Sequence, residues 1–294
     1  MYPYAWYHWL SFFYIYCFFG WIFESAYVSF EEKKFVNRGF LRIPMLPLYG
    51  TGAILMLWLC LPFESNPAME YIVGVVGATA LEYSTGVGME MLFKVRYWDY
   101  SRKKFNLNGY ICLSSSLAWG FLTLFMTDVI HHPIARFVLQ LPVATEAWIL
   151  VLISAAFLYD TIYATREALN LAKMLATITR LRAELDELQV KLALMKSEAA
   201  QNVDVFKENV KGTVSGSLAA YKAAQETKQE AKKESREALI AALSDGLNEK
   251  RELLQHYMSM HRPPILRRNP DAASRSFAKA LKDLRTAWEA RRSE

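Results

Sequence analysis

Glu24, Glu82 and Glu90 lie inside long apolar segments of the sequence. Glu24 falls in the segment from about Tyr7 to Phe30, and Glu82 and Glu90 fall in the segment from about Tyr71 to Phe93. An ionisable group within a membrane span is costly unless it is paired, hydrated or neutralised. Glu82 and Glu90 are eight residues apart, so a helix places them on roughly one face. We expect the three carboxylates to form a substrate or ion pathway; the alternative is structural pairing that fixes the helix register.

Two polar connections supply groups that could pair with these carboxylates. Residues 31–42 contain Arg38 and Arg42, and residues 94–109 contain Arg96 together with aromatic and amide side chains. Glu24 lies towards one end of its segment, so its expected partner is one of these three arginines. The residues with expected structural or charge-pairing roles are Arg38, Arg96, Trp98, Asp99 and Asn106.

Motifs for catalysis are missing from the sequence. The stretch from Gly212 to Gly216 lacks the lysine of a phosphate-binding loop, and there is neither a His-Glu-x-x-His motif nor a nucleophile elbow. The adjacent His131 and His132 do not converge on one helix face, which favours a role at a helix end. The cysteines have no paired spacing and are expected to pack as small apolar residues. We therefore expect no enzymatic activity, no cofactor and no metal site. The cysteines are Cys17, Cys60 and Cys112.

Five apolar segments are long enough to cross roughly 30 Å of hydrocarbon as helices. The four connections between them hold 4, 0, 5 and 1 Lys or Arg residues, and the region after the last segment is strongly basic. Short cytoplasmic loops collect Lys and Arg, so this alternation predicts an external N-terminus and a cytoplasmic C-terminus. The sequence thus predicts an all-α, multi-pass bundle in the cell membrane. The expected spans are Tyr7–Phe30, Pro44–Leu61, Tyr71–Phe93, Tyr110–Ile130 and Val143–Ala164.

A long helical tail follows the spans. Neither Gly nor Pro occurs from Val143 to Lys211, so the fifth span is expected to continue as one helix. Apolar residues spaced 3 and 4 apart form a coiled-coil seam from Leu171 to Ala199. We expect the seam to self-associate in parallel; the alternative is a hairpin in which it folds back on a helix from about Gln225 to Met260. The predicted domains are a transmembrane domain, 1–165, a coiled-coil helix, 166–221, and charged cytoplasmic helices, 225–294.

A basic amphipathic helix is predicted at the C-terminus. Asn269 and Pro270 form a plausible N-cap and first helical position. Apolar residues then recur at helical spacing from Phe277 to Trp288, against a face rich in Lys and Arg. Such a helix could lie on an anionic membrane surface or pack on the preceding helices, and the sequence favours neither arrangement. Asp160, near the end of the fifth span, is expected to reach to the membrane interface.

Several short motifs occur in a fixed order along the first half of the sequence. They are Gly20-Trp21-Ile22-Phe23-Glu24, Asn37-Arg38-Gly39-Phe40-Leu41, Pro47-Leu48-Tyr49-Gly50, Glu82-Tyr83 with Gly86 and Glu90, Trp98-Asp99-Tyr100-Ser101 with Asn106 and Gly109, and Ser116 with Trp119-Gly120. This ordered set resembles a bacterial family of membrane proteins, the type IV ABC-transporter or CmpB-like proteins, over about residues 12–135. The resemblance implies a permease-like membrane component.

Two functions are therefore expected from different classes. The first is a transporter permease component built around the intramembrane glutamates, with its ATPase on a separate chain because this sequence has no phosphate-binding loop. The second is a membrane-anchored coiled-coil scaffold that oligomerises or recruits cytoplasmic partners. The expected partners are the lipid bilayer, a separate ATPase subunit and further copies of the chain joined through Leu171–Ala199, and no nucleic acid.

Overall fold

The chain forms two compact units that are almost entirely helical. The computed structural model describes residues 4–63, 66–210, 219–260 and 263–290. Unit 1 comprises Met1–Met174 and Pro263–Leu281, and unit 2 comprises Leu175–Arg262 and Lys282–Glu294. The all-α prediction is confirmed, since strands occupy two residues each.

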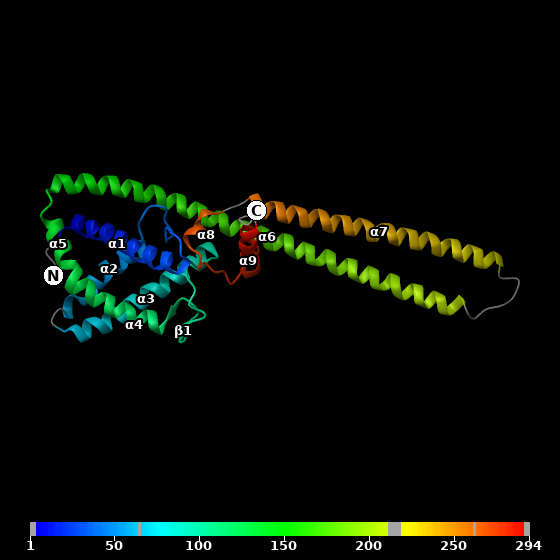
Figure 1. Ribbon diagram of the computed structural model, residues 1–294, viewed down its shortest axis with the longest axis horizontal. Coiled ribbons are helices and arrows are strands. Elements are labelled where there is room, and N and C mark those ends of the chain that lie inside the picture. Colours follow the sequence, from blue (N-terminus) through cyan, green and yellow to red (C-terminus); the bar gives the residue numbers. More distant parts are fainter. Residues whose placement is uncertain (1–3, 64–65, 211–218, 261–262, 291–294) are drawn as a thin grey trace. The chain divides into compact units, whose positions relative to one another are not determined.

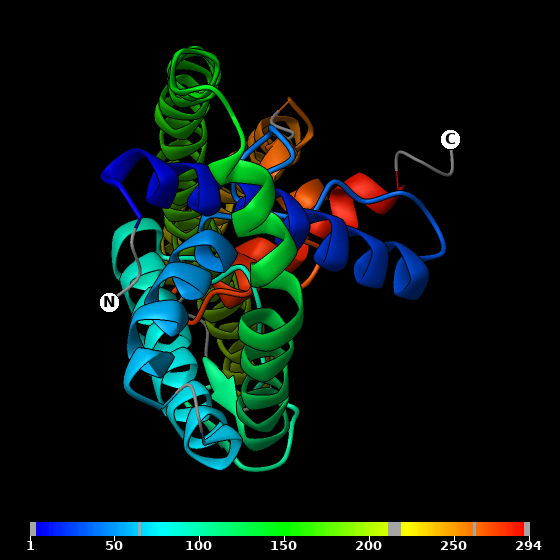
Figure 2. The same ribbon diagram turned by 90° about the vertical axis from the view of Figure 1, so that its left-hand side faces the viewer.

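Unit 1 is a bundle of helices joined by short connections (Figure 1). Its helices α3 and α4 pack most extensively on each other, and both views show them side by side (Figures 1 and 2). A two-residue antiparallel ladder, β1 with β2, closes the connection before α4. The elements are α1 (Trp6–Glu32), α2 (Pro47–Cys60), η1 (Leu61–Phe63), α3 (Pro67–Phe93), β1 (Asn106–Leu107), β2 (Ile111–Cys112), α4 (Leu113–Leu124), η2 (Phe125–Ile130), α5 (His131–Leu139), the first part of α6 (Val143–Val210) and α8 (Pro264–Arg268).

Three helical stretches in the described chain are long and apolar enough to cross a membrane: Pro67–Phe93, Leu113–Leu139 and Val143–Glu198. The stretch Pro47–Phe63 is apolar but shorter. The aromatic helix α1 is as long as α3, at 27 residues, but it is not one of these three stretches. Its many Tyr and Trp residues have low hydropathy values, although such residues favour membrane interfaces. Large apolar side chains on the outside of the bundle are exposed, for example Phe121 at 67% and Trp148 at 71%.

Local sequence signals set where α2 and α3 begin. Pro47 is the first residue of α2, where a missing N–H costs nothing, so it starts the helix. Asn66 caps α3 by accepting a hydrogen bond from the Met69 amide at 3.3 Å. Lys94 ends α3 in the left-handed conformation, at φ 58°.

The predicted end of the fourth span at His131 to Pro133 is wrong. The helix continues to Leu139 through a π turn, Phe125–Ile130, in which the His131 amide donates to the Met126 carbonyl. A π turn shifts hydrogen bonds to partners five residues away, which allows the helix to pass Pro133 without ending. His131 consequently lies inside the helix and is buried, at 1% exposure.

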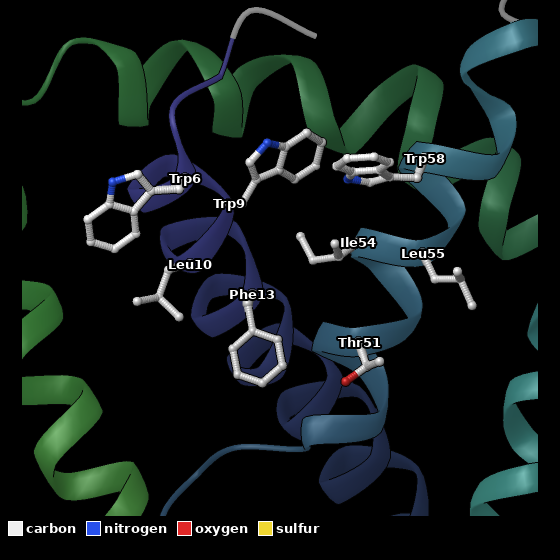
Figure 3. Close-up of a pocket in the computed structure, with 8 residues that line it drawn as sticks. All are labelled: Trp6, Trp9, Leu10, Phe13, Thr51, Ile54, Leu55 and Trp58. Carbon is white, nitrogen blue, oxygen red and sulfur yellow. The ribbon is translucent and has the colours of Figure 1, made fainter. Parts of the chain in front are cut away.

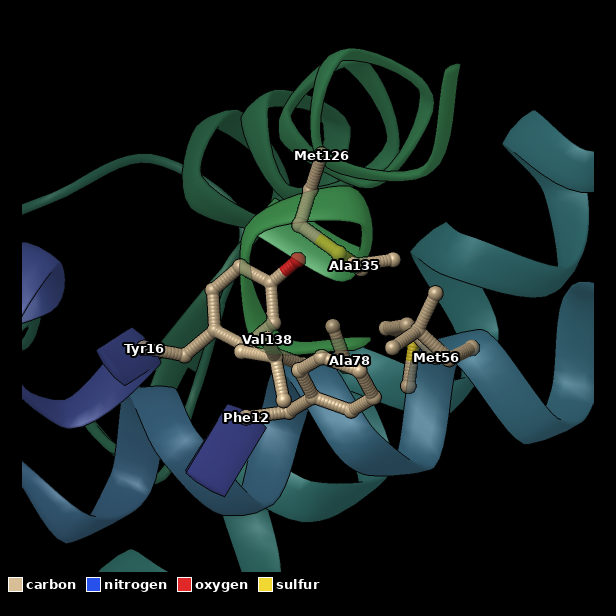
Figure 4. Close-up of a cluster of buried hydrophobic side chains, with 9 residues drawn as sticks. Phe12, Tyr16, Met56, Ala78, Met126, Ala135 and Val138 are labelled. Carbon is tan, nitrogen blue, oxygen red and sulfur yellow. The ribbon is translucent and has the colours of Figure 1, made fainter. Parts of the chain in front are cut away.

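The core of unit 1 forms where α1, α2, α3, η2 and α5 meet. Figure 4 shows the aromatic rings of Phe12 and Tyr16 entering this cluster beside Met56 and Met126. Helices α1 and α2 cross closely because Gly50 faces the Phe13 carbonyl, which a Cβ at Gly50 would approach to 2.6 Å. Small residues at such crossings let apolar helices approach each other in a membrane. The buried cluster is Phe12, Tyr16, Ala53, Met56, Leu57, Ala78, Met126, Ala135 and Val138.

Unit 2 contains the far part of α6, the helix α7 (Ala219–Met260) and most of α9 (Ala278–Ala290). Two ion pairs join α6 to α7, Glu184 with Lys250 and Glu198 with Arg236. Glu198 follows Glu184 on α6, whereas its partner Arg236 precedes Lys250 on α7. The two helices therefore run antiparallel and form a hairpin (Figure 1). The predicted continuation of the fifth span as one helix is confirmed by the 68-residue α6.

Part of the predicted coiled-coil seam from Leu171 to Ala199 is buried. Leu185 on α6 is buried, as are Leu247 and Leu254 on α7. The arrangement matches the hairpin alternative, while parallel self-association remains a prediction. The expected hinge, Gly212 to Gly216, lies outside the described residues, as does the side chain of Ala199.

The predicted start of the last helix at Pro270 is wrong, because α9 begins at Ala278. Asn269 instead caps the C-terminal end of α8, where its amide N–H donates to the Ile265 carbonyl. Residues 270–277 are not helical because their polar groups bond to other parts of unit 1, as described below.

Candidate functional site

Glu82 is the most deeply buried of the three predicted site glutamates, at 4% exposure. Its Oε1 accepts a hydrogen bond from the Tyr100 hydroxyl at 3.1 Å, and its Oε2 accepts one from the Trp119 indole N–H at 3.1 Å. Burial raises the pKa of Tyr100, and the facing Glu82 carboxylate raises it further, so the hydroxyl stays protonated and donates. Both donors are neutral, and no ion pair reaches Glu82 from the described residues.

Glu24 lies close to the Glu82 site and shares an aromatic neighbour with it. The Tyr49 hydroxyl donates to Glu24 Oε1 at 2.8 Å, and the Tyr49 ring lies 5.3 Å from the Trp119 ring, centroid to centroid. Of the three arginines considered as partners for Glu24, the structure brings Arg38 to it, with Nε 3.8 Å from Oε2. That separation is long for an ion pair, and Arg38 also faces Asp271 at 3.7 Å.

Glu90 occupies a separate position near the end of α3. Its Oε2 accepts a hydrogen bond from the Tyr110 hydroxyl at 2.6 Å, and the side chain is half-buried. No contact between Glu90 and Glu82 or Glu24 is present in the described chain. The structure therefore places Glu24 and Glu82 around the Tyr49 and Trp119 rings, and leaves Glu90 outside this group.

The remaining predicted site residues organise the connection between α3 and α4. Arg96 is buried and lies 3.3 Å from Asp99, and its guanidinium donates to the Asn108 carbonyl at 2.9 Å. The Trp98 indole donates to the Tyr110 carbonyl at 2.8 Å, and the Asn106 side chain bonds to the backbone within the loop. These contacts fix the loop that carries Tyr100 to Glu82.

A small cavity of about 60 Å³ lies beside Glu82. Among the described residues Glu82 is the only carboxylate on its wall, which otherwise consists of Tyr49, Trp119, Thr123 and apolar residues. The lining residues are Leu48, Tyr49, Gly52, Ala53, Met56, Ala78, Leu81, Glu82, Trp119, Leu122, Thr123 and Met126. No group of three or more His, Cys, Asp or Glu residues in the described ranges is arranged to hold a metal ion.

A larger groove of about 650 Å³ opens between α1 and α2 and has almost wholly apolar walls. Figure 3 shows Trp9 of α1 and Trp58 of α2 facing each other across it, with ring centroids 5.5 Å apart. Its lining residues are Trp6, Trp9, Leu10, Phe13, Thr51, Ile54, Leu55 and Trp58. The groove has no ionisable group and lies apart from the glutamates.

The sequence reasoning missed a segment that binds the loops next to the site. Residues 263–277, which we call the clasp, cross the connections 33–46 and 94–112 of unit 1. Ala273 and Arg96 exchange backbone hydrogen bonds, the Asn269 amide donates to the Gly39 carbonyl at 2.9 Å, and the Ser274 hydroxyl donates to the Lys94 carbonyl at 2.6 Å. Each of these bonds ends on a backbone group of the two connections, and backbone groups leave no pattern of charge or hydropathy in the sequence.

The clasp is also held by charge. The guanidinium of Arg268 is buried and lies 2.8 Å from Glu167 on α6, and it donates to the Phe40 carbonyl at 3.3 Å. Arg275 donates to the Asn108 carbonyl, and its guanidinium lies 5.2 Å from the centroid of the Tyr110 ring. Arg268 and Arg275 thus bind protein groups.

The Asp160 side chain is buried at 4% exposure, and its expected position at the membrane interface stays a prediction. Its Oδ2 accepts hydrogen bonds from two consecutive backbone amides, Arg42 at 2.6 Å and Ile43 at 3.1 Å. Charge-assisted bonds of this kind hold the connection before α2 against α6.

Two further buried polar groups escaped the sequence analysis. Glu146, on the first turn of α6, is 2% exposed, accepts from the Ser11 hydroxyl at 2.6 Å and lies 3.6 Å from His8. The ring nitrogens of His131 lie within hydrogen-bond distance of the hydroxyls of Tyr4 and Tyr16, at 3.2 and 3.0 Å, which replaces the helix-end role expected for it. Periodicity could not reveal these pairs, since they join residues far apart in the chain.

A protein-family model described as "Putative ABC-transporter type IV" matches residues 11–165, which is more than half of the chain. No curated protein and no solved structure matches the chain. The matched residues contain Glu24, Glu82 and the loop from Arg96 to Asn106, whereas the clasp and unit 2 lie outside the match.

Proposed function

The chain belongs to the putative ABC-transporter type IV family, and we propose that it is the permease component of a transporter in the cell membrane. In this proposal five helices span the bilayer, α1, α2, α3, the stretch Leu113–Leu139 and the first part of α6. The N-terminus lies outside, so the loops 33–46 and 94–112 face the cytoplasm, as their Lys and Arg content favours.

The observation that supports a permease role is the environment of Glu82. A buried carboxylate that is bonded only by neutral donors keeps most of its charge uncompensated. Such groups within membrane spans commonly mark substrate or ion pathways. Purely structural pairing would place a cation beside Glu82, as Arg268 is placed beside Glu167.

A transporter of this type needs ATP hydrolysis, and this sequence contains no phosphate-binding loop. The ATPase is therefore expected on a separate chain. Co-purification from native membranes in mild detergent, followed by quantitative mass spectrometry, tests this. Stoichiometric recovery of a nucleotide-binding subunit supports the permease role, and repeated recovery without one argues against it.

Cysteine labelling in whole cells tests the five-span topology. In a variant without native cysteines, a membrane-impermeant thiol reagent should modify Ser65→Cys and leave Ser101→Cys and Ser197→Cys unmodified until the cells are opened. Ser101 and Ser197 are both exposed side chains, so protection from the reagent reports the side of the membrane. Labelling of Ser101→Cys in intact cells would rule out this orientation.

The second candidate function is a membrane-anchored scaffold, and the long α6 and α7 favour it. These helices form a hairpin with many charged, exposed side chains, which suits recruitment of cytoplasmic partners or assembly with other copies. Two variants separate the candidates: a chain that lacks residues 182–260, and the full chain with Glu82→Gln. Loss of function with Glu82→Gln alone supports the permease, and loss with the deletion alone supports the scaffold.

A further inference from the structure

The cavity beside Glu82 combines a buried negative charge with aromatic faces. Glu82 receives two hydrogen bonds from neutral groups, and no Lys, Arg or protonatable His of the described chain forms an ion pair with it. Arg38 is associated with Glu24 and Asp271 and forms no ion pair with Glu82. The site therefore has an excess of negative charge that a bound cation or a proton would balance.

The walls of the cavity distinguish between these two ways of balancing the charge. A proton on Glu82 would require neither space nor ring faces, yet the cavity has a volume of about 60 Å³ and is lined by the rings of Tyr49 and Trp119. Aromatic faces attract cations that lie within about 6 Å of the ring centroid, and Trp attracts them most strongly. The centroids of the Tyr49 and Trp119 rings are 5.3 Å apart, so one small cation can lie near both rings.

The polar groups on the wall also restrict the kind of cation. Hard divalent ions take six or more oxygen ligands, whereas this wall offers the Glu82 carboxylate and the Thr123 hydroxyl beside Met56 and Met126. An ammonium group needs few acceptors, and its alkyl part is compatible with methionine and leucine side chains. The volume corresponds to roughly two water molecules at about 30 Å³ each.

We propose that this cavity binds a small monovalent alkylammonium ion of about the size of methylammonium. The ammonium group lies against Glu82 and the Thr123 hydroxyl, and the alkyl group lies beside the Tyr49 and Trp119 rings, which are in contact with each other. The proposal rests on the permease function, because it assigns a ligand class to the same site.

Isothermal titration calorimetry of the purified full chain in detergent, with methylammonium chloride as the probe, tests this binding. We expect saturable binding, and at equal ionic strength weaker binding of ammonium and none of sodium or of methanol, the uncharged analogue. Glu82→Gln should lower the affinity for methylammonium at least tenfold. Glu90→Gln is the matched control: it removes a carboxylate from the same helix outside the cavity and should leave the affinity within twofold.

Two further variants keep the test decisive if Glu82→Gln fails to fold. Trp119→Phe keeps an aromatic ring but weakens the cation attraction, with an expected loss of about twofold to fivefold. Gly52→Ala should fold, because its Cβ would lie 3.5 Å from Leu81 Cδ2, an ordinary contact, and it narrows the cavity. Gly52→Ala should therefore weaken the binding of ethylammonium more than the binding of ammonium.

The proposal is overturned if methylammonium fails to saturate the wild-type protein or if sodium competes equally. It is also overturned if neither Trp119→Phe nor Gly52→Ala changes the affinity. Because binding in detergent needs no ATPase and no transport, failure here removes the ligand class only. The permease function stands or falls separately, on the co-purification and on the cellular phenotype of Glu82→Gln.

Discussion

Arg96 and Ala273 exchange both backbone hydrogen bonds, each 2.9 Å from nitrogen to oxygen, and so join the loop after α3 to the clasp. The bridge is the centre of a set of contacts that includes Ser274 with Lys94 and Asn269 with Gly39. Through it, residues that follow α7 in the sequence hold the loop that carries Tyr100 to Glu82.

The clasp is expected to protect this loop from proteases. Asn269→Ala removes a buried amide that donates to the Gly39 carbonyl, which should cost about 1–3 kcal/mol. Opening of the clasp then becomes roughly tenfold more frequent for each 1.4 kcal/mol lost. The rate of limited trypsin digestion at the exposed residues 102–104 measures how often the clasp opens. Arg267→Ala, on the exposed side of α8, is the control and should be cut at the wild-type rate; equal rates for both variants would contradict the protective role.

Gly20 is expected to be essential to the position of Tyr49. A Cβ at Gly20 would lie 2.3 Å from Tyr49 Cβ and Cγ, so Gly20→Ala must displace the side chain that bonds to Glu24. Overpacking of this kind costs about 1–3 kcal/mol, which thermal unfolding in detergent should detect. Gly88→Ala is the matched control because a Cβ there meets nothing within 4 Å, and it should be neutral or slightly stabilising. An unfolding midpoint for Gly20→Ala equal to that of Gly88→Ala would refute the close contact.

Asp160 is expected to contribute to stability through the amides of Arg42 and Ile43. Asp160→Ala leaves two backbone donors without this acceptor, at about 1–3 kcal/mol each, whereas Asp160→Asn retains a neutral oxygen. The unfolding midpoints should decrease in the order wild type, Asp160→Asn, Asp160→Ala. Tyr159→Phe, a change at the exposed neighbouring residue, should not alter the midpoint. A different order would show that the carboxylate is not the group that holds the loop.

The hairpin of unit 2 can be tested by crosslinking. In a background without Cys17, Cys60 and Cys112, a short bifunctional thiol reagent should join Glu184→Cys to Lys250→Cys within one chain, because these side chains form an ion pair. The mismatched pair Glu184→Cys with Arg236→Cys should not react, because Arg236 lies about 21 Å from Lys250 along α7, at about 1.5 Å per residue.

Parallel self-association gives a different result in the same experiment. Glu184→Cys alone would then form a covalent dimer, because parallel copies bring identical positions together. A faster-migrating monomer from the matched pair supports the hairpin. Dimers from the single variant at Glu184 would support the coiled coil predicted from the seam.

The helices were predictable because their signals are local. The absence of Gly and Pro after Val143 indicated the length of α6, and Lys94 closes α3 immediately after the last apolar residue, Phe93. Pro133 misled the prediction, because a proline usually ends a helix and the compensating π turn depends on hydrogen bonds that the sequence does not display.

The candidate site was only partly predictable. Polarity within an apolar segment identified Glu24 and Glu82, since this is a property of the sequence itself. The partners Tyr49, Tyr100 and Trp119 could not be assigned, because each comes from a different element and aromatic residues are frequent throughout this chain. The clasp bonds largely to backbone carbonyls of the connections 33–46 and 94–112, which every residue carries, so its binding partners could not be predicted from the sequence.

The clasp also imposes an order on the biogenesis of the protein. Synthesis proceeds from the N-terminus, so every apolar helix of the bundle emerges from the ribosome before residue 263 does. Until then the loop at Arg96 lacks its partner at Ala273, and the newly inserted bundle displays unpaired backbone groups. Synthesis of the clasp is therefore registered on the bundle itself, and a product truncated within α7 would keep its apolar helices while the backbone of Arg96 lacks its partner.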